Sequence, residues 1–245
     1  NPSDMVTYVP VNGFATTDLG CEKGNNLCNF VNRLGGENTK AYLSLFNELW
    51  NSDSRFADVS QLVWLYKLSE STLNVAASDR MPEIDVFVEE LKRQDCPGDL
   101  FAFIDRHMPH HLVFILKNGQ EMMLLINYKE WKDGTHTEFR IAGTFATVWM
   151  AAESLQLKIE GQLLQHIYDH FVAQISGIGE HKAGALSEMV ELKKRIAAME
   201  TELQSLEKKM RRELQYDIQV RMKKQVNAKR RELAEFSQEL EALSV

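Results

Sequence analysis

An acid followed by the pattern Glu-x-Lys is the feature of this sequence with the most specific chemical meaning. Glu90 and Lys92 are separated by one residue, so on a strand their side chains share a face, and Asp79 and Asp85 lie upstream. Metal-dependent nucleases use such carboxylates to hold Mg²⁺ and the lysine to steady the attacking water or the phosphate. Glu-x-Lys is also frequent by chance in charged sequences. The pattern therefore gives an alternative function, a nuclease with Asp85, Glu90 and Lys92 as its site and Mg²⁺ as its cofactor; otherwise we expect no cofactor.

A run of ten Lys and Arg residues near the C-terminus is the second feature. It contains only two acidic residues, Glu213 and Asp217, although the whole chain has a formal net charge of -7. Such a run suits salt-sensitive binding to nucleic-acid phosphates, but it equally suits an acidic protein partner or a solvated helix face. Tyr216 is the one aromatic residue within it, so base stacking is not indicated. The basic residues are Lys208, Lys209, Arg211, Arg212, Arg221, Lys223, Lys224, Lys229, Arg230 and Arg231.

Histidines form the third group of residues that could carry chemistry. His166 and His170 lie four apart, a spacing that can hold zinc on one face of a helix, but the Glu of a metalloprotease motif is missing between them. His107, His110 and His111 cluster before an apolar run. We expect all five to be surface or interface histidines and predict no metal site. The sequence contains no P-loop, dinucleotide-binding glycine motif or nucleophile elbow.

The composition is that of a globular protein, with 44% hydrophobic and 26% charged residues in 245. The apolar runs are shorter than the roughly 18–20 residues that a membrane span needs. The three cysteines lack CxxC spacing, which fits a reducing compartment without disulfides or zinc. The N-terminus lacks the pattern of a secretory signal. We therefore expect a cytoplasmic protein with no membrane partner.

Residues 39–176 predict an α+β domain with a mainly antiparallel sheet and flanking helices, after an irregular N-terminal segment at 1–38. Short runs of alternating or continuous apolar residues predict the strands, and longer amphipathic runs predict the helices. Asn118-Gly119 is a strong two-residue hairpin signal. The predicted strands are 61–68, 83–91, 111–117, 121–128 and 139–149, and the predicted helices are 39–50, one capped by Asp99, and 155–175.

The second of these strands predicts one buried face and one solvated face. Its alternation places Ile84, Val86 and Val88 toward the core. The same alternation places Asp85 and Glu89 toward solvent.

Residues 185–245 contain neither Pro nor Gly and predict a long helix after a glycine-containing joint at 177–184. Unbroken, it would run on the order of 85 Å at about 1.5 Å per residue. Apolar residues form one heptad seam before the basic middle and another after it, with steps of four between them. This pattern predicts a coiled coil whose seams must be covered by another surface. The predicted interface residues are Met189, Leu192, Ile196, Met199, Leu203, Leu206, Met210, Leu233, Phe236 and Leu240.

Four stretches of the sequence resemble a bacterial group, domain-of-unknown-function family 4391. They are VWLYKLSESTLNV, EIDVFVEELK, LVFILKNGQEMMLLINYK and KKMRRELQYDIQVRMKKQVNAKRREL, which together span roughly residues 60 to 240. The resemblance implies no established chemistry. It implies a genomic setting beside helicases and DNA methyltransferases in restriction-like, anti-phage gene clusters.

These observations favour a non-catalytic interaction or scaffolding subunit of such a defence assembly. We expect it to dock through the C-terminal coiled coil onto itself, a helicase or a methyltransferase encoded nearby. The basic middle would contact DNA or an acidic partner surface.

Overall fold

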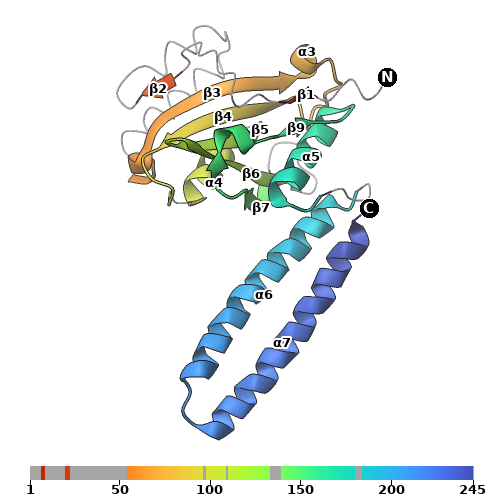
Figure 1. Cartoon of the computed structure of the whole chain (residues 1–245). Helices are drawn as coiled ribbons and strands as arrows, with labels where there is room; N and C mark the ends of the chain where they lie inside the picture. The colour runs from red at the N-terminus through yellow and green to blue at the C-terminus, as the bar shows by residue number, and fades with distance from the viewer. Residues whose placement is uncertain are drawn as a thin grey trace. The chain divides into compact units, whose positions relative to one another are not determined.

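The protein consists of two compact units, Asn1–Gly177 and Ile178–Val245 (Figure 1). They are described here from a computed structural model, which covers residues 7–8, 20–22, 54–95, 98–108, 110–132, 139–179 and 184–244. The first unit is α+β with a mainly antiparallel sheet, which confirms the predicted fold class. The helix predicted at 39–50 and most of the segment 1–38 lie outside the described residues.

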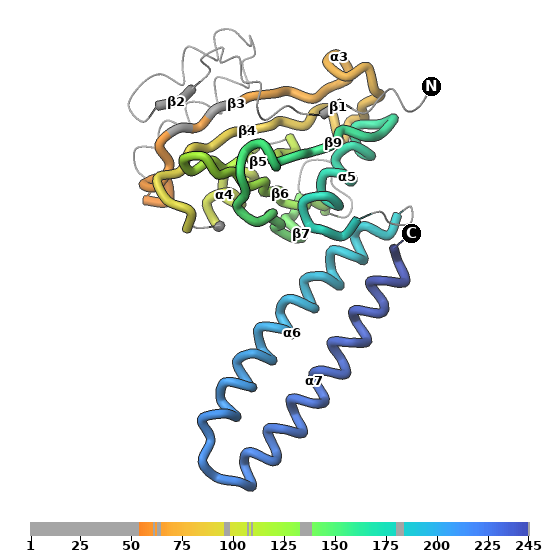
Figure 2. Tube along the Cα trace, in the orientation of Figure 1, coloured from red at the N-terminus to blue at the C-terminus, as the bar shows by residue number. Residues whose placement is uncertain are grey.

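The sheet of the first unit has the strand order β2-β3-β4-β5-β6-β7, with β8 paired to β6. Figure 2 shows β3 and β4 side by side. All neighbours are antiparallel except β4 and β5, which are parallel and joined through helix α4. A separate pair is formed by β1 and β9. The strands are β1 (Thr7–Tyr8), β2 (Gly20–Glu22), β3 (Val59–Ser69), β4 (Glu83–Leu91), β5 (His111–Asn118), β6 (Glu121–Trp131), β7 (Phe139–Ala146), β8 (Met150–Ala151) and β9 (Lys158–Ile159). The helices are η2 (Ser54–Asp58), α3 (Glu70–Leu73), α4 (Gly98–His107), η3 (Ala152–Ser154) and α5 (Leu164–Ser176).

The β5–β6 hairpin confirms the turn predicted at Asn118-Gly119, but the two turn residues lie one position later. Asn118 still pairs with Glu121, so the turn residues are Gly119 and Gln120. Gly119 has φ +61°, which a glycine adopts without steric cost at the first turn position. The Asn118 amide instead donates to the backbone oxygen of Leu91, 2.8 Å away, and so ties the hairpin to β4.

Strand β4 is covered on both faces, so the prediction that one of its faces is solvated was wrong. Asp85 and Glu89 are both fully buried. They lie on the face of Phe87, which packs with α4 residues such as Leu100 and Ile104 in the hydrophobic core. On the opposite face, Tyr168 of α5 contacts the His111 ring edge-on, and α5 packs its buried side on the sheet. A parallel neighbour and two flanking helices leave β4 no solvated face.

Helix α5 begins at Leu164, nine residues later than the sequence predicts. The preceding residues instead contain β9 and a bridge between Ala76 and Leu163. Gly161 explains the late start, because its φ of +148° lies outside the range of a right-handed helix.

A side chain at position 161 is expected to destabilise the first unit. A Cβ on Gly161 would lie 2.9 Å from Cβ of His166 and 3.0 Å from the backbone nitrogen of Ile167. Gly161→Ala therefore combines a clash with a strained φ, and we expect it to cost about 1–3 kcal/mol. Gly119→Ala, also at positive φ but with open space around it, is the matched control for the clash. Equal destabilisation of the two variants in urea unfolding would contradict this explanation.

The second unit is a helical hairpin, so the expectation of an unbroken rod was wrong. Helix α6 (Leu186–Arg212) and helix α7 (Tyr216–Leu243) are separated by the three residues Glu213, Leu214 and Gln215. The two helices pack along each other (Figure 1). The Glu213 carboxylate accepts hydrogen bonds of 2.8 Å from the backbone nitrogens of Leu214 and Gln215 and so stabilises the turn. None of the described helices is long and apolar enough to cross a membrane.

The hairpin explains the two separate heptad seams, because each helix offers its apolar stripe to the other within one chain. Residues of both seams, such as Leu203, Leu206 and Phe236, are half-buried, and Val226 is buried. The steps of four that interrupted the seam coincide with the turn. A second chain is therefore not required to cover the seams.

Candidate functional site

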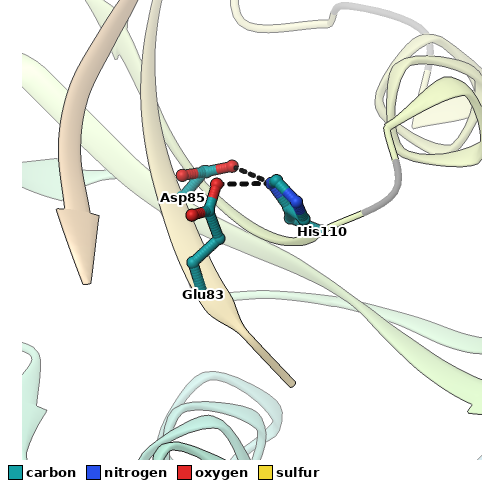
Figure 3. Close-up of side chains that lie close together, drawn as sticks. All are labelled: Glu83, Asp85 and His110. Carbon is teal, nitrogen blue, oxygen red and sulfur yellow. Dashed lines mark hydrogen bonds and ion pairs between the residues drawn. The ribbon is translucent and has the colours of Figure 1, made fainter. Parts of the chain in front are cut away.

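Two carboxylates and an imidazole meet where β4 and β5 begin (Figure 3). Glu83 and Asp85 are on β4, and His110 immediately precedes β5. The His110 Nδ1 atom lies 2.6 Å from Glu83 Oε1 and 3.2 Å from Asp85 Oδ2, as the dashed lines of Figure 3 mark. The side chain of Asp85 is 0% exposed, that of Glu83 10% and that of His110 28%. The cluster is thus inside the fold on one side and open to solvent on the other.

The parallel pairing of β4 and β5 brings these residues together. Ile84 is the register partner of His111, so the residue before β5 lies next to the first residues of β4. Glu83 and Asp85 are two apart and share a face. On the other side of β4, Lys67 of β3 is paired in register with Asp85, and its ammonium forms an ion pair with Glu83.

Charges in the cluster are mutually compensated. Burial lowers the pKa of His110, but hydrogen bonds to Asp85 and Glu83 outweigh it and raise the pKa to about 9. Burial raises the pKa of Glu83, yet the hydrogen bonds from His110 and Lys67 leave it below its ordinary value. Burial dominates at Asp85 and raises its pKa despite the bond from His110. His110 is therefore an imidazolium at neutral pH in this arrangement.

A buried lysine fixes the backbone of the loop that carries His110. Lys129 of β6 donates to the backbone oxygens of His110 at 2.6 Å and Met108 at 3.2 Å, and it forms an ion pair with Asp105 of α4. Asn127 donates to Asp105 Oδ2 at 2.8 Å. Burial raises the pKa of Asp105 to about 6 and lowers the pKa of Lys129, and their contact opposes both effects. We call Asp105, Asn127 and Lys129 the buried brace.

Chemically, the cluster combines the donors of a divalent cation site. Glu83, Asp85 and His110 each offer a ligand atom, and the three atoms lie within 4.8 Å of one another. The sequence did not single out Glu83, Lys67 or the buried brace. One signal was available in the sequence. Phe87 is apolar and lies between Asp85 and Glu89 on the same face of the strand, which indicates that this face is buried.

The residues of the predicted nuclease site are not brought together. Asp85 and Glu90 are five residues apart on one strand, so their side chains point to opposite faces. Glu90 lies 4.0 Å from Lys117, and the Lys92 amine donates to the backbone oxygen of Ala57, 2.7 Å away. Asp79 is exposed in a turn.

The other histidines do not join a metal-ligating group among the described residues. His166 is exposed, and His170 lies 3.6 Å from Glu160. His111 is buried, and burial lowers its pKa to about 3, so its imidazole is neutral. The position of the His107 side chain is outside the described part of the structure.

The turn of the helical hairpin carries seven exposed cations. We call residues 208–224 the basic turn, which contains Lys208, Lys209, Arg211, Arg212, Arg221, Lys223 and Lys224. At its apex Leu214 is 97% exposed and Tyr216 76% exposed. None of the seven cations forms an ion pair with a described acidic residue.

The remaining predicted basic residues lie along the helices and are partly used within the hairpin. Lys229 forms an ion pair with Glu202, and Arg230 lies 2.7 Å from Glu207. Arg231 is exposed. The ten residues of the predicted basic surface therefore separate into seven at the turn and three further along α7, of which Lys229 and Arg230 pair with α6.

Comparisons with known proteins bear on the family and not on the chemistry. No curated protein and no solved structure matches the chain. The sequence profile of a family described as a domain of unknown function (DUF4391) matches residues 55–233, which include β3–β7, α4, α5 and most of the helical hairpin. The match confirms the resemblance, and the chain belongs to this family.

Proposed function

We propose that the protein is a non-catalytic interaction subunit that docks through its helical hairpin and contacts DNA phosphates with the basic turn. The observation that carries the proposal is the set of seven exposed cations around an apex with exposed Leu214 and Tyr216. Surface cations that form no ion pair with a described acidic residue can readily replace the counterions around the phosphates of a nucleic acid.

Both helices contribute cations to the basic turn, which favours an extended acidic ligand. Arg211 and Arg212 end α6, while Arg221 and Lys223 belong to the second turn of α7. Guanidinium groups match phosphate oxygens in two-point hydrogen bonds. A phosphate backbone presents such groups at regular intervals, whereas a single acidic side chain would leave most of the seven cations unused.

Protein docking is the second part of the proposal. Leu214 and Tyr216 are large and exposed and lie two positions apart at the apex, and Tyr and Arg are frequent anchors of protein interfaces. The setting implied by the family resemblance supplies the partners that we propose, a helicase or DNA methyltransferase of a bacterial anti-phage assembly. The protein would act in the cytoplasm, where such enzymes reach DNA.

Charge reversal in the basic turn is expected to weaken DNA binding. For Lys223→Glu/Lys224→Glu we expect at least tenfold weaker binding of a duplex of arbitrary sequence near 0.1 M salt, and a salt slope smaller by about 2, because each lost phosphate contact lowers it by about 0.9. Fluorescence anisotropy of the full chain against labelled duplex measures both. Lys158→Glu/Lys194→Glu reverses two half-exposed lysines outside the turn and is the control. Equal losses in the two variants, or no salt-dependent binding by the wild type, would refute DNA contact through the turn.

The nuclease suggested by the sequence has less support, because its three residues do not converge. Asp85 belongs instead to the cluster with Glu83 and His110. We therefore do not propose catalysis by Asp85, Glu90 and Lys92.

A further inference from the structure

We propose that Glu83, Asp85 and His110 form a binding site for a divalent first-row transition-metal ion. The first argument is geometric, since the three donor atoms lie within 4.8 Å of one another. Ligand atoms about 2.0–2.2 Å from one ion are separated by at most about 4.4 Å, so small side-chain movements bring all three into coordination.

The second argument is an unsatisfied atom inside the cluster. Asp85 is fully buried, and its Oδ1 atom has no hydrogen-bond partner among the described residues. A buried carboxylate oxygen without a partner is costly, and an unplaced ion is one of the causes to consider. The one hydrogen-bond partner of Asp85 Oδ2 among the described residues is His110 Nδ1, which is already 2.6 Å from Glu83 Oε1.

The hydrogen on His110 Nδ1 is shared poorly between two carboxylates. One N–H points at one acceptor, but here it faces oxygens at 2.6 and 3.2 Å. A divalent ion in its place would accept a lone pair from the imidazole and from both carboxylates at once, and the displaced proton would go to solvent. Two carboxylates would then face a doubly charged ion, and the Lys67 ammonium would compete with that ion for Glu83.

The surroundings suit a metal site that keeps an exchangeable position. The buried brace fixes the backbone at His110 through Lys129, so one ligand is held in place before an ion arrives. The His110 side chain is 28% exposed and marks the solvent side of the cluster, where water would complete the coordination. An imidazole among the ligands favours Zn²⁺ over Mg²⁺ and Ca²⁺, which prefer oxygen donors.

Metal titration of the full chain tests the site directly. After stripping with a chelator, we expect one equivalent of Zn²⁺ to bind at least tenfold more tightly than Mg²⁺ in calorimetry. Asp85→Asn and His110→Gln are expected to weaken Zn²⁺ binding at least tenfold. Glu90→Gln, on the opposite face of the same strand, and His170→Gln are the matched controls and should bind as the wild type does. No uptake by the wild type, or equal losses in the controls, would overturn the proposal.

Two further measurements do not depend on the folding of variants in the buried ligands. Mn²⁺ bound to the wild type should show a coupled imidazole nitrogen in pulsed electron paramagnetic resonance. Lys67→Met, at a 44% exposed position, should bind Zn²⁺ several-fold more tightly, because the Lys67 ammonium competes for Glu83. A Mn²⁺ spectrum without nitrogen coupling, or weaker binding by Lys67→Met, would contradict the site. Neither result bears on the basic turn, so this proposal fails or stands separately from the proposed function.

Discussion

Replacing Lys129 by Met is expected to destabilise the first unit by about 3–5 kcal/mol, because the buried Asp105 carboxylate loses its compensating charge. Lys129 is 1% exposed and Asp105 0% exposed, so water cannot take over the lost interaction. The same substitution removes the hydrogen bonds to the His110 and Met108 carbonyls. Denaturant unfolding followed by tryptophan fluorescence measures the loss specifically, because all four tryptophans precede Gly177.

A double variant separates lost charge compensation from lost packing. Lys129→Met/Asp105→Leu removes both charges, and Asn127 keeps the Phe101 oxygen, 3.2 Å away, as an acceptor. Replacing a buried ion pair by apolar residues is often neutral, so we expect most of the stability to return. If the free energy of unfolding of the single variant Lys129→Met lies within about 1 kcal/mol of the wild-type value, the buried brace does not stabilise the fold as expected.

Replacing Glu89 by Leu is expected to stabilise the first unit increasingly as pH rises. Glu89 is fully buried, neither carboxylate oxygen has a hydrogen-bond partner among the described residues, and burial raises its pKa from 4.5 to about 8. Between these two values the unfolded chain loses the proton while the folded chain keeps it. Rising pH therefore favours unfolding of the wild type over this interval.

The free energy of unfolding of Glu89→Leu, relative to that of the wild type, is expected to increase by on the order of 4 kcal/mol between pH 4.5 and pH 8.5. Urea unfolding at several pH values gives this difference, and the subtraction cancels the groups that both proteins share. Glu90→Leu, at a half-buried position on the other face of β4, is the control for removing a carboxylate from this strand. A difference between Glu89→Leu and the wild type that does not change with pH would mean that Glu89 is ionised in the fold.

Local patterns predicted the strands that are specified by their own residues. The run from Glu83 to Leu91 and the two runs around Gly119 became β4, β5 and β6 nearly as predicted, because continuous apolar segments and a turn glycine act over short distances. The side of β4 that Asp85 and Glu89 occupy depends on α4, which is adjacent only after the crossover to β5. Alternation alone therefore placed them in solvent.

The site and the hairpin depended on contacts that are distant in sequence. His110 reaches Glu83 through the parallel register of β4 and β5. Lys129 of β6 forms its ion pair with Asp105 of α4, although the whole of β5 lies between them in the sequence. Residues 213–215 contain no helix breaker, so good helix formers predicted continuity there. The chain turns because folding back lets each heptad seam cover the other, and the interruption of the seam near Leu214 was the local sign of it.

The most direct test of the interaction proposal is photo-crosslinking from the apex of the basic turn. A benzophenone amino acid at Tyr216 is compared in cells with the same group at Val148, which is 75% exposed in the first unit against 76% for Tyr216. The proposal predicts covalent products with DNA or with a defence-associated protein from position 216 and none from position 148. Products from position 148 alone, or none from position 216, would contradict docking through the hairpin.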